Sequence, residues 1–114
     1  MDNINIYKLH ADVCKTFSNY RRLQIVEYLG KVSNCTASEL VNKLKINKVS
    51  LSQHMGILVE QGVVGAKRNG VNVIYNLTDS RITKACNLMR EVLISRLEKQ
   101  SNIFNKLTKM EEKK

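Results

Sequence analysis

The most informative stretch of the sequence is residues 47–77, which read NKVSLSQHMGILVEQGVVGAKRNGVNVIYNL. Its first half predicts a helix over about residues 48–61, because Asn47 is a good N-cap and Gly62 a good stop. Its second half predicts a β-hairpin, because Asn69-Gly70 separates two β-prone runs. A helix followed directly by a hairpin places a candidate recognition helix beside a candidate wing.

The helical spacing of apolar residues predicts four further helices. They cover residues 5–16, 20–30, 36–45 and 81–108 or beyond, with a short strand near Cys35. Gly30 is expected to end the second helix, and Thr36 with Glu39 forms a capping box at the start of the third. Asp79 or Ser80 is expected to cap the last helix.

Two short helices joined by a tight turn and followed by a hairpin are typical of a winged helix-turn-helix. We therefore expect a mainly α fold with a small β-hairpin (α+β). The 114 residues suit a single winged-helix DNA-binding domain over residues 1–114. A core of this size is modest, so pairing of two copies would add stability.

The net charge of +9 favours a polyanionic partner, since 19 Lys and Arg face only 10 Asp and Glu. Charge alone leaves DNA, RNA and anionic lipid open, as well as a merely soluble basic protein. No apolar run approaches the ~18 residues of a membrane span, and no signal peptide opens the chain. We therefore expect a cytoplasmic protein without a membrane partner.

A helical wheel divides residues 48–61 into a core face and an outward face. The core face consists of Leu51, Met55 and Leu58. Directly opposite lie Val49, Gln53 and Gly56, with Ser50, Ser52 and Ile57 on the flanks. His54 falls about 60° from the centre of the core face. Glycine inside a helix costs ~1 kcal/mol against alanine, so Gly56 suggests a close approach of DNA or of a neighbouring helix.

The N-terminal part of the outward face is small and polar, as a major groove requires. Gln and Ser side chains bond base edges, and Val49 suits a thymine methyl group. Lys48 and the helix N-terminus favour phosphate, as do Lys67 and Arg68 on the wing, and Arg68 also suits a minor groove. The candidate DNA-binding residues are Lys48, Val49, Ser50, Ser52, Gln53, His54, Lys67, Arg68 and Asn69. The alternative is a solvated helix face with a solubilising hairpin, but the hairpin and the charge together favour double-stranded DNA.

Three segments together resemble the ArsR/SmtB family of small winged-helix repressors. They are Ser52-Gln53-His54-Met55, Val59-Glu60-Gln61-Gly62-Val63-Val64 and Ile74-Tyr75-Asn76-Leu77. Phe17-Ser18-Asn19-Tyr20-Arg21-Arg22-Leu23 also resembles a family motif, with Arg22 at the position of the usual arginine. The resemblance covers roughly residues 8–95. His54 matches the family's usual histidine in this helix, which implies that His54 has a structural role or assists a phosphate contact.

The resemblance implies a homodimer joined through the first and last helices, with residues 81–110 as a long C-terminal dimerisation helix. It also implies repression of a promoter, usually relieved by a metal ion or another chemical signal. The family's two best-known metal sites do not fit this chain. Thr36 and Ser38 occupy the arsenic-type Cys-x-Cys positions, and the zinc-type positions on the last helix hold Asp79, Arg81, Val92 and Ser95. We therefore expect no metal site and no cofactor, and the inducer is unknown.

The three cysteines lie far apart in the sequence, and an odd number in a cytosolic chain argues against a disulfide framework. The resemblance places Cys14 and Cys86 on the two helices of the expected dimer interface, which makes them candidates for a thiol sensor. The alternative is that both behave as small buried hydrophobes. Cys35 is expected at a more exposed loop edge, without a partner.

No catalytic constellation appears, because the chain has two lone histidines, no Gly-rich phosphate loop and no paired carboxylates. We therefore expect a non-enzyme. One alternative is a protein–protein interaction module that uses the long basic last helix, but Arg96 and Gln100 interrupt its heptad-like seam. Another is an RNA-binding winged helix, but with four Tyr and two Phe the chain has few aromatics for base stacking.

Overall fold

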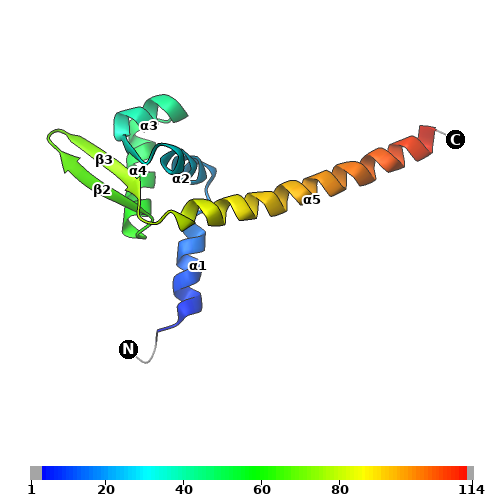
Figure 1. Ribbon diagram of the computed structural model, residues 1–114, viewed down its shortest axis with the longest axis horizontal. Coiled ribbons are helices and arrows are strands. Elements are labelled where there is room, and N and C mark those ends of the chain that lie inside the picture. The colour runs from blue at the N-terminus through cyan, green and yellow to red at the C-terminus, as the bar shows by residue number, and fades with distance from the viewer. Residues whose placement is uncertain (1–3, 113–114) are drawn as a thin grey trace. The chain divides into compact units, whose positions relative to one another are not determined.

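The computed structural model describes residues 4–112, which form five helices and a small three-stranded sheet (Figure 1). In chain order these are α1 (Ile6–Thr16), α2 (Tyr20–Val32), β1 (Asn34–Thr36), α3 (Ala37–Leu44), α4 (Lys48–Glu60), β2 (Val64–Asn69), β3 (Asn72–Leu77) and α5 (Arg81–Glu112). The described residues fall into two compact units, one ending at Ile82 and one beginning at Thr83. The expected mainly helical fold with a β-hairpin is confirmed. The ends of the expected domain, residues 1–3 and 113–114, lie outside the described residues.

The core of the first unit is built from apolar side chains of α2, α3, α4 and the segment that enters β2. Its buried members include Ile25, Val26, Leu29, Leu40, Leu51, Met55, Leu58, Val63 and Val64. Leu51, Met55 and Leu58 are each at most 1% exposed, so the core face expected from the wheel of α4 is confirmed. Burial of that face fixes which side of α4 remains available to a ligand.

Side-chain caps begin α2 and α3, and the cap of α3 lies at Thr36, where the sequence predicts it. The Asn19 side chain accepts hydrogen bonds from the backbone N–H groups of Arg21 and Arg22 at 2.9 and 3.2 Å. The Thr36 hydroxyl accepts one from the N–H of Glu39 at 3.2 Å. These bonds satisfy donors that a helix N-terminus otherwise leaves unpaired.

The expected end of the second helix at Gly30 is wrong, because α2 continues to Val32. The helix ends where Ser33 adopts a φ of 70° and donates its N–H to the Leu29 carbonyl at 3.0 Å. Leu29 is fully buried beside Gly30, and burial of that helix face outweighs the ~1 kcal/mol propensity cost of a single glycine.

The hairpin exists, but its turn lies one residue further along than expected. Asn69 pairs with Asn72, so the two loop residues are Gly70 and Val71 rather than Asn69 and Gly70. Gly70 has a φ of 65°, whereas neither Asn69 nor Val71 has a positive φ. A positive φ at the first loop residue alone is the requirement of a type II′ turn, which takes glycine there, whereas type I′ needs it at both.

The short strand near Cys35 is confirmed as β1, and it joins the hairpin by pairing antiparallel with β3, so that the strand order is β1-β3-β2. The expected exposure of Cys35 is wrong, because this central residue of β1 is 2% exposed. Burial, with a smaller contribution from Glu39, raises the pKa of its thiol to about 11. A thiol with so high a pKa stays protonated at neutral pH and is a poor nucleophile.

Candidate nucleic-acid interface

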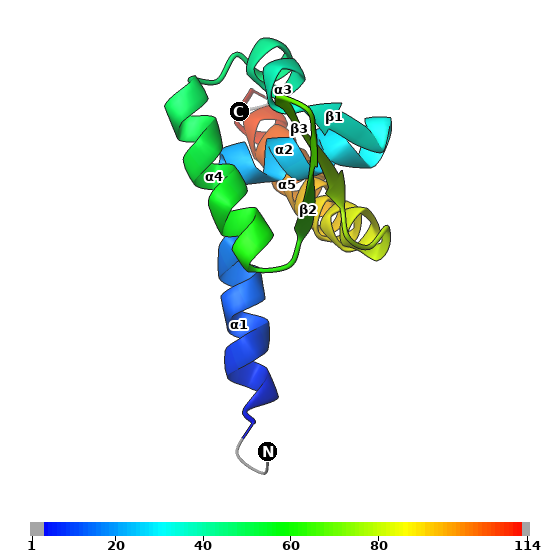
Figure 2. The same ribbon diagram turned by 90° about the vertical axis from the view of Figure 1, so that its left-hand side faces the viewer.

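The connection between α3 and α4 is a tight turn that sets the start of α4. Lys45 adopts a left-handed conformation (φ 51°, ψ 45°) and Ile46 turns into the core at 5% exposure. The Arg21 guanidinium donates to the Leu44 carbonyl at 2.9 Å, which ties the end of α3 to α2. Figure 2 shows α4 joined to α3 at one end and leading into β2 at the other. This is a helix-turn-helix followed by a wing.

Asn47 caps α4 as expected. Its side-chain oxygen accepts hydrogen bonds from the N–H groups of Val49 at 2.7 Å and Ser50 at 3.3 Å. Those two donors are therefore engaged within the chain. The positive charge at this end of α4 comes instead from the Lys48 ammonium group and the positive end of the helix dipole.

The outward face of α4 is open to solvent. Val49 is 67% exposed, Ser52, Gln53 and Gly56 are also exposed, and Ser50 is half-buried. The partition of α4 expected from the wheel is therefore confirmed as a pattern of burial. An exposed valine between polar neighbours at the first turn is the arrangement that a base edge with a methyl group can use.

His54 lies behind this surface and contacts an arginine of α2. The Nη1 of Arg22 lies 3.5 Å from the Nδ1 of His54, and its Nε donates to the Thr16 carbonyl at 2.6 Å. Arg22 thus connects the end of α1 to the middle of α4. Desolvation, then the charges of Arg22 and Arg21, lower the pKa of His54, so its neutral form is favoured.

Sequence reasoning missed this link. Arg22 and His54 were identified separately, because each matches a residue that is usual at that position in the ArsR/SmtB family. The spacing of 32 residues gives no local signal that they meet, and Thr16, which is 3% exposed, was not considered at all.

The wing exposes its basic residues. Lys67, Arg68 and Asn69 are all exposed on β2, where Lys67 pairs with Ile74 and Arg68 with Val73. Successive side chains of a strand point to opposite faces, so Lys67 and Arg68 address different sides of the hairpin.

Gly56 has no packing role within the described chain. A Cβ atom built at this position has nothing within 4 Å of it. We expect Gly56→Ala to raise the free energy of unfolding by roughly 0.5–1 kcal/mol, since alanine is the better helix former and finds space here. Urea denaturation of the two proteins checks this, and a loss of stability would mean that a neighbour of Gly56 packs closely against it.

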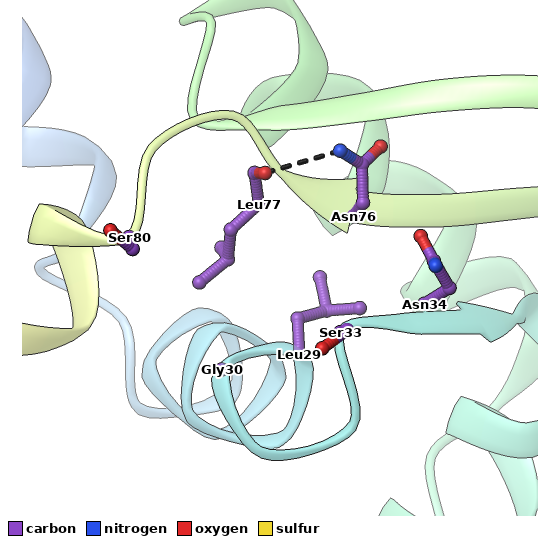
Figure 3. A pocket seen from close by; sticks show the side chains of 7 residues that line it. All are labelled: Leu29, Gly30, Ser33, Asn34, Asn76, Leu77 and Ser80. Atoms are coloured by element: carbon purple, nitrogen blue, oxygen red, sulfur yellow. Dashed lines mark hydrogen bonds between the residues drawn. The ribbon is translucent and has the colours of Figure 1, made fainter.

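A shallow pocket of about 300 Å³ lies between the end of α2, β1 and the end of β3 (Figure 3). The Leu29 and Leu77 side chains supply its apolar part, and the Asn76 amide donates to the Leu77 carbonyl at 3.1 Å. The other lining residues are Gly30, Ser33, Asn34 and Ser80. All of these side chains are uncharged, so the pocket has neither a metal-binding nor an acid–base character.

Asp79 caps α5, as expected, rather than standing open as a ligand. Its carboxylate accepts from the Arg81 N–H at 2.9 Å and from the Arg81 guanidinium at 2.7 Å. These bonds to Arg81 lower the pKa of Asp79 to about 2. Among residues 4–112, no three His, Cys, Asp or Glu side chains gather as a metal site would require.

The two candidate sensor cysteines differ in their surroundings. Cys14 is exposed on α1, whereas Cys86 on α5 is half-buried. Burial raises the pKa of the Cys86 thiol, although Arg90 partly offsets this, so the thiolate that reacts with oxidants and metals is disfavoured. A thiol sensor made of Cys14 and Cys86 stays a prediction.

Comparison with known proteins identifies the family to which this fold and sequence correspond. Residues 19–65 match the family described as "Bacterial regulatory protein, arsR family". The HTH-type transcriptional regulator Rv0081 of Mycobacterium tuberculosis is 31% identical over 93 residues, which cover 82% of each chain. The chain belongs to the ArsR family. The crystal structure of Rv0081 matches with a TM-score of 0.77 and 30% identity, over 86% of this chain and 98% of that one.

Other ArsR-type relatives carry different functional names. The biofilm growth-associated repressor of Xylella fastidiosa is 31% identical over 91 residues, covering 80% of this chain and 78% of the relative. The transcriptional activator HlyU of Vibrio cholerae is 28% identical over 78 residues, covering 68% and 71%. These ArsR relatives are regulators rather than enzymes, and this chain is a transcription regulator of the winged helix-turn-helix type. Within the part of the chain that the structure describes, no helix is both long and apolar enough to cross a membrane.

Proposed function

We propose that this protein is a homodimeric repressor that binds specific sequences of double-stranded DNA. The observation that carries the proposal is the face of α4 opposite the core. It is solvent-exposed, small and polar at its N-terminal end, and it leads directly into a wing with exposed Lys67 and Arg68. A helix with this surface fits a major groove, and the adjacent hairpin fits the phosphate backbone.

Each residue of the site has a role in this proposal. Base edges are read by Val49, Ser50, Ser52 and Gln53, and phosphates are bound by Lys48, Lys67, Arg68 and Asn69. His54 holds α4 in place through Arg22 instead of reading bases, because it is half-buried and its neutral form is favoured. The net charge of +9 supplies attraction over a longer range.

In this proposal residues 1–114 form one functional domain, and the homodimer forms through α1 and α5. An apolar seam along α5 supports this interface. We call it the α5 stripe, and it consists of Ile82, Cys86, Met89, Leu93, Ile103, Leu107 and Met110. From Met89 onward its members are between 44% and 70% exposed in the single chain. On α1, Ile6 and Leu9 are 65% and 53% exposed. Large apolar side chains exposed along whole helices mark an interface.

A gel-shift titration with full-length protein and random and promoter-derived duplexes tests the DNA-binding part. We expect tight binding to particular duplexes, with an affinity that falls steeply as salt rises, because bound cations displace counterions from phosphate. Absence of binding to any duplex at low salt would remove the proposal. Repression itself is tested by a reporter placed behind the bound promoter, where activation by the protein would contradict it.

Removing either wing cation should weaken binding to all sequences alike. Because each substitution removes one cation from each of the two wings of the dimer, we expect the slope of log affinity against log salt to become shallower by about 2 for Lys67→Ala and for Arg68→Ala. Lys31→Ala is the matched control, because Lys31 is an exposed lysine on α2 that pairs with Glu27 at 3.3 Å. An unchanged salt slope in both wing variants would show that the wing does not contact phosphate.

A further inference from the structure

The outward face of α4 carries no guanidinium group. Lys48, at the first position, is the single cation of α4, and the outward residues that follow are Val49, Ser52, Gln53 and Gly56. Arginine and lysine are the side chains that most often read guanine, at O6 and N7. Lys48 binds phosphate in the proposed function, so no cation remains on this face to read a G·C pair.

The two arginines of α2 beside this site are committed to contacts within the chain. Arg21 donates to the Leu44 carbonyl at 2.9 Å and to the Gln24 side chain at 3.1 Å. Arg22 donates to the Thr16 carbonyl at 2.6 Å and contacts His54. Moving either toward a base would break bonds that hold α4 in place, so neither replaces the missing guanidinium.

The groups that remain on this face suit A·T pairs. Val49 presents exposed methyl groups, which complement the methyl group of thymine. Gln53 presents an amide, which bonds adenine at N6 and N7 together. The two residues are one turn apart, about 6 Å along the helix, against a rise of about 3.4 Å per base pair. Their contacts therefore fall within about two neighbouring steps of the duplex.

We propose that α4 reads neighbouring A·T base pairs, with Val49 on a thymine methyl group and Gln53 on the edge of an adenine. Gly56 lies one turn further along the same face with no Cβ, so the helix backbone can come close to the DNA there. This inference rests on the proposed function, because it needs α4 to enter a major groove. It adds the chemical identity of the bases that the operator half-site must hold.

Modified duplexes test the inference atom by atom. Full-length protein first selects its preferred sites from a pool of randomised duplexes, and single bases of a selected site are then replaced. Uracil for thymine removes one methyl group, and we expect roughly a fourfold loss of affinity at the position that Val49 contacts. Replacing adenine by 7-deazaadenine removes the N7 acceptor, and we expect roughly a tenfold loss at the position that Gln53 contacts.

Variants assign each effect to its side chain. Val49→Ala keeps only one methyl group, so it should distinguish thymine from uracil less well than the wild type while still distinguishing adenine from 7-deazaadenine. Gln53→Ala should bind adenine and 7-deazaadenine duplexes equally while still distinguishing thymine from uracil. Val59→Ala and Gln61→Ala are the matched controls, because they remove exposed residues of the same types at the other end of α4. Both controls should keep the wild-type pattern.

Two outcomes overturn the inference while leaving DNA binding intact. One is selection of sites whose strongly preferred positions are all G·C. The other is a Val49→Ala protein that still distinguishes thymine from uracil as the wild type does. Failure of the pool to yield any preferred sequence is a different result, because it overturns the proposed function itself.

Discussion

Met89→Asp is expected to produce a monomer whose affinity for its operator is at least about 100-fold lower. Met89 is 70% exposed in the single chain, so the substitution costs the isolated fold little. In the proposed dimer it places a carboxylate inside an apolar seam, where an unpaired buried charge costs several kcal/mol. A monomer binds one half-site, and losing the linkage between two half-sites typically costs 100-fold or more.

Sedimentation velocity and gel shift on the same preparations check both halves of this expectation. Asn87→Asp is the matched control, because it adds the same charge to the same helix at an exposed position outside the α5 stripe. It should remain a dimer with normal affinity. A Met89→Asp protein that stays dimeric would rule out the α5 stripe as the interface. A wild-type monomer would favour instead an α5 that binds another protein.

The elements that position the recognition surface were predictable because their signals are local. Asn47 caps α4 with hydrogen bonds to residues two and three positions later, and a spacing of three and four residues brings Leu51, Met55 and Leu58 onto one face. Such relations depend on helix geometry alone. The exposure of Val49 and Gln53 follows from the same periodicity, without knowledge of the remaining fold.

The features that were wrong or missed depend on contacts distant in sequence. Cys35 is buried because β1 pairs with β3, where it lies opposite Tyr75, forty residues away. The α2 helix runs past Gly30 because Leu29 packs into a core to which other elements contribute. A sequence pattern that spans ten or twenty residues cannot indicate which distant strand or helix will pack against a residue. The predicted position of the hairpin turn was wrong for a different reason. Asn-Gly permits a type I′ turn over Asn69 and Gly70, but the pairing of Asn69 with Asn72 places the turn at Gly70 and Val71.

The contact between Arg22 and His54 belongs to this second group, and it links a helix of the proposed dimer interface to the helix proposed to read DNA. Arg22 touches the last residue of α1, a helix of the proposed dimer interface, and also the helix proposed to read DNA. One side chain therefore contacts both helices. That double contact makes Arg22 the position in the first unit where a single change should have the widest consequences.

Arg22→Met should lower the free energy of unfolding by about 2–3 kcal/mol, because it removes charge-assisted hydrogen bonds and leaves the carbonyl of the buried Thr16 without the donor that Arg22 supplies. Arg22→Lys keeps the charge but not the geometry of the guanidinium, so its free energy of unfolding should lie between those of the wild type and Arg22→Met. Urea denaturation near neutral pH measures all three proteins. A stability of Arg22→Met within about 0.5 kcal/mol of the wild type would show that the link contributes nothing to folding.

The same link should make stability sensitive to acid. The pKa of His54 is lowered in the folded protein, chiefly by desolvation and then by Arg22 and Arg21, relative to about 6.5 in the unfolded chain. The unfolded chain therefore binds the proton more readily, and the stability present above about pH 6.5 is lost progressively as the pH falls below it. Asp79, with a pKa of about 2, titrates in a separate and more acidic range.

Urea denaturation at a series of pH values between neutral and mildly acidic isolates this contribution. His54→Gln should flatten the dependence on pH more than the control His10→Gln, which removes the chain's other, exposed histidine. Arg22→Met should reduce the dependence as well, because removing the guanidinium removes one of the charges that lower the pKa of His54. If His54→Gln kept the full acid sensitivity of the wild type, the titrating group would lie elsewhere, and Arg22 would act on α4 through packing alone.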